Sequence, residues 1–124
     1  MAVRFNHTII TARDPEASAR FLAEMLGLPD PVPFGPFQAV EDINGVSLDF
    51  ARADHEITPQ HYAFLISESE FDEVFGRIRE RNLPYWADPG RTRPGEISDH
   101  HGRGVYFPDP DGHFLEVITR PYDE

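Results

Sequence analysis

The chain has 124 residues, no cysteine and a formal net charge of −11, from 22 acidic residues and 11 basic ones. The absence of cysteine excludes disulfides, thiolate nucleophiles and zinc–thiolate sites, so His, Asp and Glu are the strong metal ligands available. The acidic balance disfavours binding to nucleic acid or to an anionic membrane surface. The sequence contains neither an apolar run long enough for a transmembrane helix nor a signal peptide, so we expect one cytoplasmic domain.

The predicted elements begin with a strand over residues 3–12, which is rich in β-branched and aromatic side chains. A helix follows, because Asp14 suits an N-cap, Pro15 suits the first helical position and Gly27 suits a left-handed C-cap. The apolar positions expected on its buried stripe are Ala17, Phe21, Leu22 and Met25. Two strands should come next, over about 37–43 and 45–53.

The turn between these two strands is predicted at Asn44-Gly45, a pair typical of tight β-hairpins. From residue 60 the same order of elements recurs. A strand is expected over 60–67, and a helix over 68–82 starts at a capping box formed by Ser67 and Glu70. A short strand, a long polar loop and a hairpin over 104–117 complete the chain.

The two halves, about 1–56 and 57–124, also share residues at fixed offsets, which indicates an internal repeat. Each half opens on a strand that carries a histidine, His7 or His61. A phenylalanine lies 14 residues after each histidine. Near their ends, "GVSLD" aligns with "GHFLE", so that Asp49 corresponds to Glu116.

If the halves pack as pseudo-twofold partners, His7, Asp49, His61 and Glu116 converge from distant parts of the chain. This convergence would explain why Glu116 sits among apolar neighbours in a strand that should face the core. Two imidazoles and one carboxylate on rigid strands suit non-haem Fe(II), and Mn(II), Zn(II) or Ni(II) can occupy similar sites. The sequence therefore predicts a divalent metal site, with Fe(II) preferred.

Three segments give the chain a resemblance to the vicinal oxygen chelate superfamily of glyoxalase I, extradiol dioxygenases, fosfomycin resistance enzymes and bleomycin resistance proteins. They are "FNHTII", "QHYAFLI" and "YFPDPDGHFLE". The resemblance implies an α+β fold in which two βαβββ modules form a U-shaped mixed sheet around a metal. It implies His7, His61 and Glu116 as metal ligands, Asp49 as a fourth ligand on the pattern of glyoxalase I, and Tyr106 as a phenol beside the substrate.

A polar loop over about 88–102 is longer than most connections and is predicted to act either as a lid or as a solvated loop. Arg91 and Arg93 within it, with Arg103 just beyond, would attract an anionic small molecule if they do not simply face solvent. His100 and His101 end the loop, and an imidazole near an open metal position can act as a general acid or base. Of the two, we assign His101 as the candidate.

The function expected from these residues is a metal-dependent enzyme that chelates two adjacent oxygens of a small substrate, with extradiol dioxygenase chemistry preferred. Glyoxalase-like isomerase or lyase chemistry comes second, and a resistance enzyme that opens an epoxide with a thiol comes third. The alternative from another class is a metal-free protein that sequesters an aromatic or cationic molecule, as bleomycin resistance proteins do. The resemblance also implies a homodimer.

Overall fold

The computed structural model describes residues 3–99 and 101–121 of the chain, which divides into two compact units at the junction of Ile57 and Thr58. The first unit contains β1 (His7–Ala12), α1 (Pro15–Leu26), β2 (Val32–Phe34), β3 (Phe37–Ile43) and β4 (Val46–Arg52). The second contains β5 (His61–Leu65), α2 (Glu68–Glu80), β6 (Gly104–Pro108) and β7 (Phe114–Ile118). In the described part of the chain, neither helix is long and apolar enough to cross a membrane.

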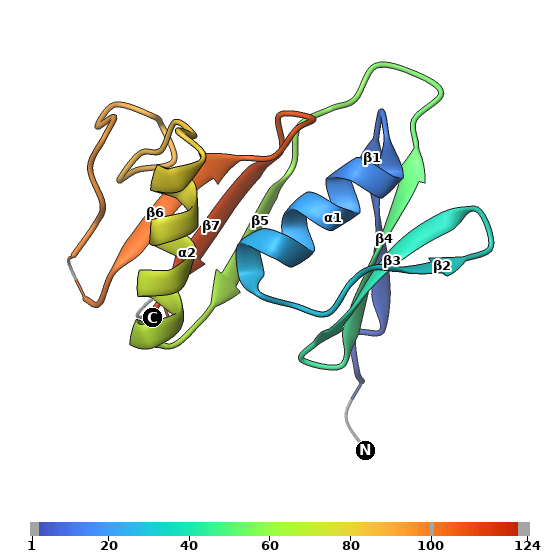
Figure 1. Ribbon diagram of the computed structural model, residues 1–124, viewed down its shortest axis with the longest axis horizontal. Helices are drawn as coiled ribbons and strands as arrows, with labels where there is room; N and C mark the ends of the chain where they lie inside the picture. The colour runs from blue at the N-terminus through green and yellow to red at the C-terminus, as the bar shows by residue number, and fades with distance from the viewer. Residues whose placement is uncertain (1–2, 100, 122–124) are drawn as a thin grey trace. The chain divides into compact units, whose positions relative to one another are not determined.

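In the first unit, four strands form a mixed sheet in the order β1-β4-β3-β2, and α1 lies along one face of it (Figure 1). β1 and β4 run parallel, whereas the other neighbours are antiparallel. The predicted hairpin turn is confirmed, since Asn44 and Gly45 both have positive φ. β1 begins at His7 rather than at residue 3, because β4 offers ladder partners only from Val46 onward. The short strand β2 was not predicted.

Helix α1 begins and ends where its capping residues predict. The Asp14 side chain accepts a hydrogen bond from the Ala17 amide, Pro15 opens the helix, and Gly27 adopts the left-handed conformation. The prediction that Ala17 faces the core is wrong, because its side chain is exposed. Leu22 and Met25 are buried as predicted, and Phe21 is half-buried. The full buried stripe consists of Pro15, Ser18, Ala19, Leu22, Ala23 and Met25.

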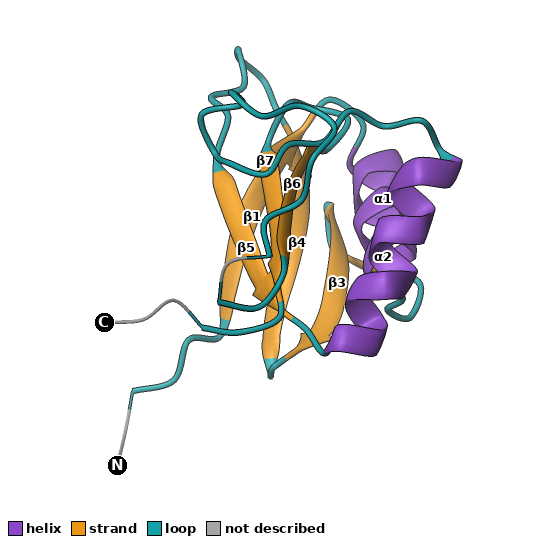
Figure 2. Cartoon of the chain, turned by 90° about the vertical axis from the view of Figure 1, so that its left-hand side faces the viewer, coloured by secondary structure: helices purple, strands orange, loops and turns teal. Residues whose placement is uncertain are grey.

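In the second unit, three strands form a mixed sheet in the order β5-β7-β6, and α2 covers one face of it (Figure 2). The predicted capping box of α2 is confirmed: the Ser67 hydroxyl accepts from the Glu70 amide, and the Glu70 carboxylate accepts from the Ser67 amide. Because side chains alternate along each strand, the sheet has one apolar face and one opposite face that carries polar side chains. The buried apolar residues of α2, β6 and β7 are Phe71, Val74, Ile78, Val105, Phe107, Leu115 and Val117.

The α+β fold class and the modular architecture are confirmed, but the second module departs from βαβββ. Its sheet has three strands, and only isolated bridges of Trp86 and Ser98 lie along the free edge of β6 in the described residues. Prolines at 84, 89 and 94 punctuate this stretch. Because proline donates no backbone hydrogen bond, the segment pairs with β6 at separate points instead of as a continuous strand.

The β6–β7 hairpin turns as predicted at its Asp- and Gly-rich segment. The buried Asp109 carboxylate accepts hydrogen bonds from the amides of Asp111 and His113. Burial raises the pKa of Asp109, while the backbone amides partly oppose that effect. His113 is buried too, and its Nδ1 accepts from the Gln60 amide, which ties the turn to the start of β5. His113 is therefore structural.

Replacing Ser67 with alanine should lower the free energy of unfolding by about 1 kcal/mol, because the first turn of α2 loses the acceptor for the Glu70 amide. Denaturant unfolding followed by circular dichroism measures the change. Ser67→Asp, which keeps an acceptor at the cap, serves as the control and should stay close to the wild type. Equal losses in both variants would show that the cap does not stabilise the helix.

Candidate metal centre and pocket

The residues predicted to act together in the second unit lie on one face of its sheet. β5 and β7 pair in parallel, with His61 opposite Phe114 and Ala63 opposite Glu116, while β6 pairs Tyr106 with Glu116. Side chains of residues paired across a sheet share a face, and those two residues along a strand share it as well. His61, Tyr106 and Glu116 therefore project from the face opposite the apolar core.

His61 and Glu116 are in direct contact. Nε2 of the imidazole lies 2.9 Å from Oε1 of the carboxylate, and the imidazole ring centre lies 5.7 Å from that of Tyr106. Only 2% of Glu116 is exposed, whereas 45% of the His61 side chain is. Burying a carboxylate is costly unless a positive or hydrogen-bonding group faces it. The imidazole meets part of this requirement, and it stays partly exposed beside the buried carboxylate.

The first unit repeats this arrangement with the same register. His7 lies opposite Ser47 on the parallel neighbour β4, and Asp49 follows two residues later, just as Glu116 follows the partner of His61. His7 and Asp49 therefore share one face of their own sheet. The Asp49 carboxylate is 6% exposed and accepts a hydrogen bond of 2.6 Å from the Ser47 hydroxyl. The exposed His7 contacts the side chain of Asn6 instead.

The structure thus brings His61 and Glu116 into contact in the second unit and places His7 and Asp49 on one sheet face in the first. Within residues 3–99 and 101–121, no group of three or more His, Asp and Glu side chains is gathered tightly enough to hold a metal ion. Each unit is described by itself, so the convergence of His7 with His61 and Glu116 stays a prediction. The matching registers support the internal repeat from which that prediction came.

A pocket of about 260 Å³ opens beside the Glu116 carboxylate in the second unit. Tyr106 and Glu116 contribute from the sheet, and His101 contributes from the end of the polar loop, so the two candidate catalytic residues line the same pocket. The full lining consists of Ala87, Ser98, His101, Arg103, Gly104, Tyr106, Glu116, Ile118, Arg120 and Pro121. The predicted metal ligand, phenol and imidazole therefore face one cavity.

The predicted substrate-binding arginines lie outside this lining. The Arg91 guanidinium stacks over the rings of Phe114, at 4.5 Å, and Trp86, at 5.6 Å. Arg93 pairs with Glu96 through two hydrogen bonds in the exposed part of the loop. Phe114 shares the sheet face of Glu116, so Arg91 stays a candidate at the edge of that face. His100 lies outside the described residues.

The polar loop has internal structure. The Asp88 carboxylate accepts hydrogen bonds from the hydroxyl and amide of Thr92 and from the amide of Arg93. The Thr92 hydroxyl is the main reason that the pKa of Asp88 lies below its ordinary value. The segment therefore folds around a carboxylate at its start, which restrains the Ala87 wall of the pocket.

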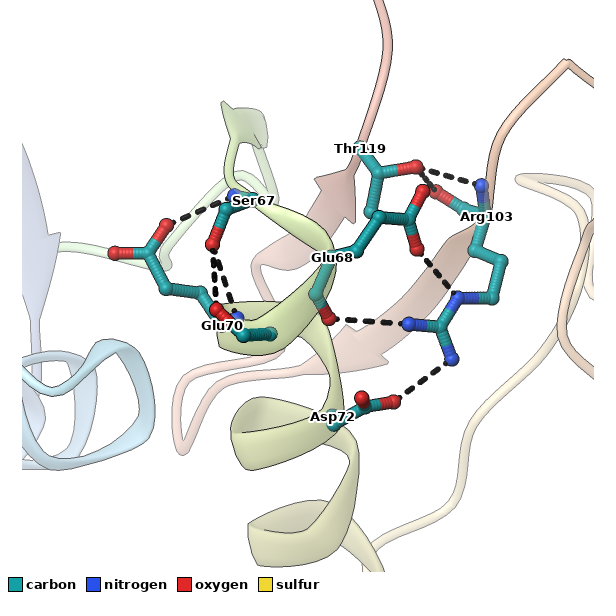
Figure 3. A network of polar contacts seen from close by, with 7 residues as sticks. Ser67, Glu68, Glu70, Asp72, Arg103 and Thr119 are labelled. Carbon is teal, nitrogen blue, oxygen red and sulfur yellow. Dashed lines mark hydrogen bonds and ion pairs between the residues drawn. The ribbon is translucent and has the colours of Figure 1, made fainter.

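Arg103 fastens the end of the loop to α2 (Figure 3). Its guanidinium donates to the carboxylates of Glu68, at 2.8 Å, and Asp72, at 2.9 Å, and lies 4.4 Å above the Phe71 ring. Its backbone pairs with Thr119, at the end of β7. Hydrogen bonds to these two carboxylates raise the pKa of Arg103 further. The cluster of Glu68, Asp72, Arg103 and Thr119 is called the Arg103 clamp below.

The residues of this chain match a known family. The sequence model of the "Glyoxalase/Bleomycin resistance protein/Dioxygenase superfamily" matches residues 4–117. The chain belongs to this superfamily. Its members among solved structures confirm the fold: the chain is 62% identical to "Oxidase ChaP-H1", with a TM-score of 0.96, over 99% of this chain and 100% of that one.

Two further relatives, one named as an oxidase and one as a transferase, are also similar to this chain. "Oxidase ChaP-H2" is 59% identical, with a TM-score of 0.96, over 100% of this chain and 98% of that one. "Metallothiol transferase FosB" of Lysinibacillus sphaericus (strain C3-41) is 32% identical over 92% of this chain and 80% of its own length. The family resemblance inferred from three sequence segments is therefore confirmed.

Two polar residues of the pocket, Ser98 and Arg120, were missed by reasoning from sequence. Ser98 lies in the irregular segment that pairs with Gly104 at the sheet edge. Arg120 follows the end of β7, where a polar residue ordinarily indicates only the end of a strand. One signal was available: Arg120 lies four residues after Glu116, and the two-residue period of a strand puts both on the same side of the chain if the extended backbone continues.

Removing any one of the predicted ligands should abolish tight metal binding. After anaerobic reconstitution with Fe(II) and desalting, we expect about one metal per wild-type chain and little in His7→Ala, His61→Ala and Glu116→Ala. Elemental analysis of the desalted protein gives the ratio. Asp49→Ala, measured in parallel, tests the fourth ligand.

His55→Ala is the matched control for the metal measurement, because His55 is 70% exposed and pairs only with its neighbour Asp54 among the described residues. It should retain the metal. Retention of the metal by both His61→Ala and Glu116→Ala would refute the assignment of the centre.

The Arg103 clamp should make stability depend on acidity. The Thr119 hydroxyl, followed by Arg103, holds the pKa of Glu68 below its ordinary value. A carboxyl whose pKa is lower in the folded state stabilises the fold above its unfolded pKa, and this stabilisation is lost as the pH falls below about 4. Glu68→Gln should therefore melt at a lower temperature than the wild type at pH 7, and the gap should close in acid.

Thermal melts at several pH values test this prediction, with Glu80→Gln as the control on the same helix. The control should melt with the wild type across the range. A gap between Glu68→Gln and the wild type that persists unchanged at pH 3 would contradict the stabilising role of the ionised Glu68.

Proposed function

We propose that this protein is a divalent-metal-dependent enzyme that oxidises a small substrate bound through two adjacent oxygen atoms. The observation that carries the proposal is the contact of His61 with the buried Glu116, beside Tyr106 and at the wall of a pocket. The identity of 62% with an oxidase over nearly the full length of both chains supports oxidation over other reactions of the superfamily.

The metal would be held by His61 and Glu116 from the second unit and by His7 from the first. The donors fit a divalent ion: two imidazole nitrogens and one carboxylate leave open positions for substrate, and this set suits Fe(II). The burial of Glu116 supports the assignment, because an adjacent cation offsets the cost of an ionised carboxylate in a largely dry position. Asp49 is the candidate for a fourth ligand.

A bound divalent metal would supply Lewis acidity, a template for two substrate oxygens and, as Fe(II), the means to use O₂. Tyr106 would orient the substrate, because its ring stands beside His61 and reaches the pocket. His101 would accept or donate a proton at the opposite wall, where the loop delivers it. The apolar Ala87, Ile118 and Pro121 would exclude water from a ring-shaped substrate.

Within oxidation, extradiol cleavage of a catechol is the specific reaction we propose to test first. The two-histidine, one-carboxylate set and the tyrosine of the hairpin favour it. The reaction consumes one O₂ for each catechol, places both oxygen atoms in the ring-opened product and needs no other reductant. The alternative within the superfamily is thiol transfer, which the 32% identity to a metallothiol transferase supports.

Three assays on the Fe(II)-loaded protein separate these reactions. Oxygen uptake with a panel of catechols tests the oxidation, loss of a methylglyoxal hemithioacetal tests the isomerase or lyase reaction, and consumption of thiol with fosfomycin tests the transfer. We expect uptake of O₂ above background in the first assay only. Uptake should vanish in Glu116→Gln and fall about 100-fold in Tyr106→Phe, in which the metal is retained.

Activity in the second or third assay without oxygen uptake would overturn the oxidase proposal while leaving the metal centre in place. Tight binding of an aromatic cation by protein that takes up no metal would favour the sequestering alternative. The predicted homodimer is tested separately, by light scattering of the purified protein.

A further inference from the structure

The pocket beside Glu116 contains two arginines, and the structure gives them different roles. Arg103 is bound through its guanidinium to the carboxylates of Glu68 and Asp72. Two negative charges therefore surround that one cation, and its side chain is only 28% exposed. Arg103 lines the pocket as part of the wall and has little positive charge left to offer a ligand.

Arg120 is the second pocket arginine, and the Arg103 clamp fixes its backbone. The amide of Thr119 donates to the carbonyl of Arg103, and the Thr119 hydroxyl accepts from the Arg103 amide. Arg103 is itself attached to α2 (Figure 3). The residue that follows Thr119 therefore leaves the end of β7 at a defined point. Arg120 therefore starts from a rigid position.

Gly102 fixes the course of the Arg120 side chain. A Cβ atom at Gly102 would lie 2.8 Å from Cγ and 3.0 Å from Cδ of Arg120, so the stem of the arginine rests directly on the glycine backbone. Gly102 also has a φ of +85°, which side-chain-bearing residues rarely adopt. The glycine permits this close approach, and Arg120 is one of the residues that line the pocket.

No carboxylate among the described residues forms an ion pair with Arg120, in contrast to Arg93 and Arg103. The acidic residue in the same lining, Glu116, is already in contact with His61. The half-buried Ser98, a hydroxyl donor, contributes to the same wall. The pocket thus holds a cation and a hydroxyl donor in the same lining as Glu116, in a chain whose net charge of −11 otherwise repels anions.

We propose that Arg120, assisted by Ser98, binds an anionic oxygen group of the substrate, such as a carboxylate or a phosphonate, at the end remote from the chelating oxygens. The inference rests on the proposed function, because it refines the substrate of the same site. A guanidinium presents paired donors that match such a group, and a hydrogen bond of this charged kind exceeds a neutral one in strength. The substrate is then a small molecule that has two adjacent oxygen atoms for chelation and also carries an acidic substituent.

Calorimetric titrations under anaerobic conditions test this pairing on Fe(II)-loaded protein. The ligands are catechol, 3,4-dihydroxybenzoate and its methyl ester. We expect the wild type to bind the acid about tenfold more tightly than catechol or the ester, which corresponds to roughly 1.4 kcal/mol. Arg120→Gln should lose this preference while its affinity for catechol stays within about twofold, and Arg120→Lys should retain part of it.

Arg20→Gln is the matched control, since it removes the same charge from an exposed position on α1. It should behave as the wild type with all three ligands. Equal affinity of the acid and the ester in the wild type, or an unchanged preference in Arg120→Gln, would overturn the inference.

A second titration, with benzoate and phenylphosphonate on metal-free protein, separates the two proposals and tells a carboxylate from a phosphonate. Chemical-shift changes of Ser98 that saturate with either anion in the wild type, and that disappear in Arg120→Gln, support the anion site whether or not a metal binds. Absence of saturable shifts with both anions counts against it. If the dihydroxy ligands bind equally with and without Fe(II), the proposed function fails, and this titration alone decides the role of Arg120.

Discussion

The parallel pairing of two strands in each unit is the constraint on which the candidate site depends. In the second unit, His61 at the start of β5 pairs with Phe114 on β7. Glu116 follows Phe114 by two residues, so its side chain lies on the same face as His61. β1 and β4 repeat this register in the first unit. A shift of one residue would turn His61 or Glu116 to the opposite face and destroy the pair. Register, rather than any local motif, therefore creates the donor set.

This register also buries a carboxylate on the sheet face opposite the apolar core. Glu116 is almost completely buried, and a charge in that position needs a compensating partner. His61 supplies one at 2.9 Å, and a divalent cation would supply another. The same requirement links fold to function, because a group that is costly to bury in an empty site becomes a ligand once a cation is bound. Under the proposed function, Tyr106 and the pocket would supply the surroundings in which a substrate meets that cation.

Much of this arrangement follows from short-range sequence signals. Asp14, the Asn44-Gly45 turn and the capping box at Ser67 fixed the element boundaries, because each acts on backbone groups within a few residues of itself. The repeat predicted that His61 and Glu116 are neighbours, because residues at equivalent positions of two similar halves are expected to occupy equivalent places in the fold. The interrupted edge of the second sheet was harder to predict, because isolated bridges leave no regular alternation in the sequence.

Electrostatic roles could not be read from the sequence, because they depend on which charges meet in space. Arg91, Arg93 and Arg103 form an obvious basic cluster along the chain, yet each of them contacts other side chains in the fold. Arg91 stacks on two aromatic rings, Arg93 pairs with one carboxylate, and Arg103 pairs with two. Arg120 stands apart from that cluster and reaches the pocket across Gly102. The density of basic residues along a sequence thus overstates how many of them are available to bind a ligand. A basic residue becomes a recognition group only where the fold leaves its charge unmatched and holds its stem in place.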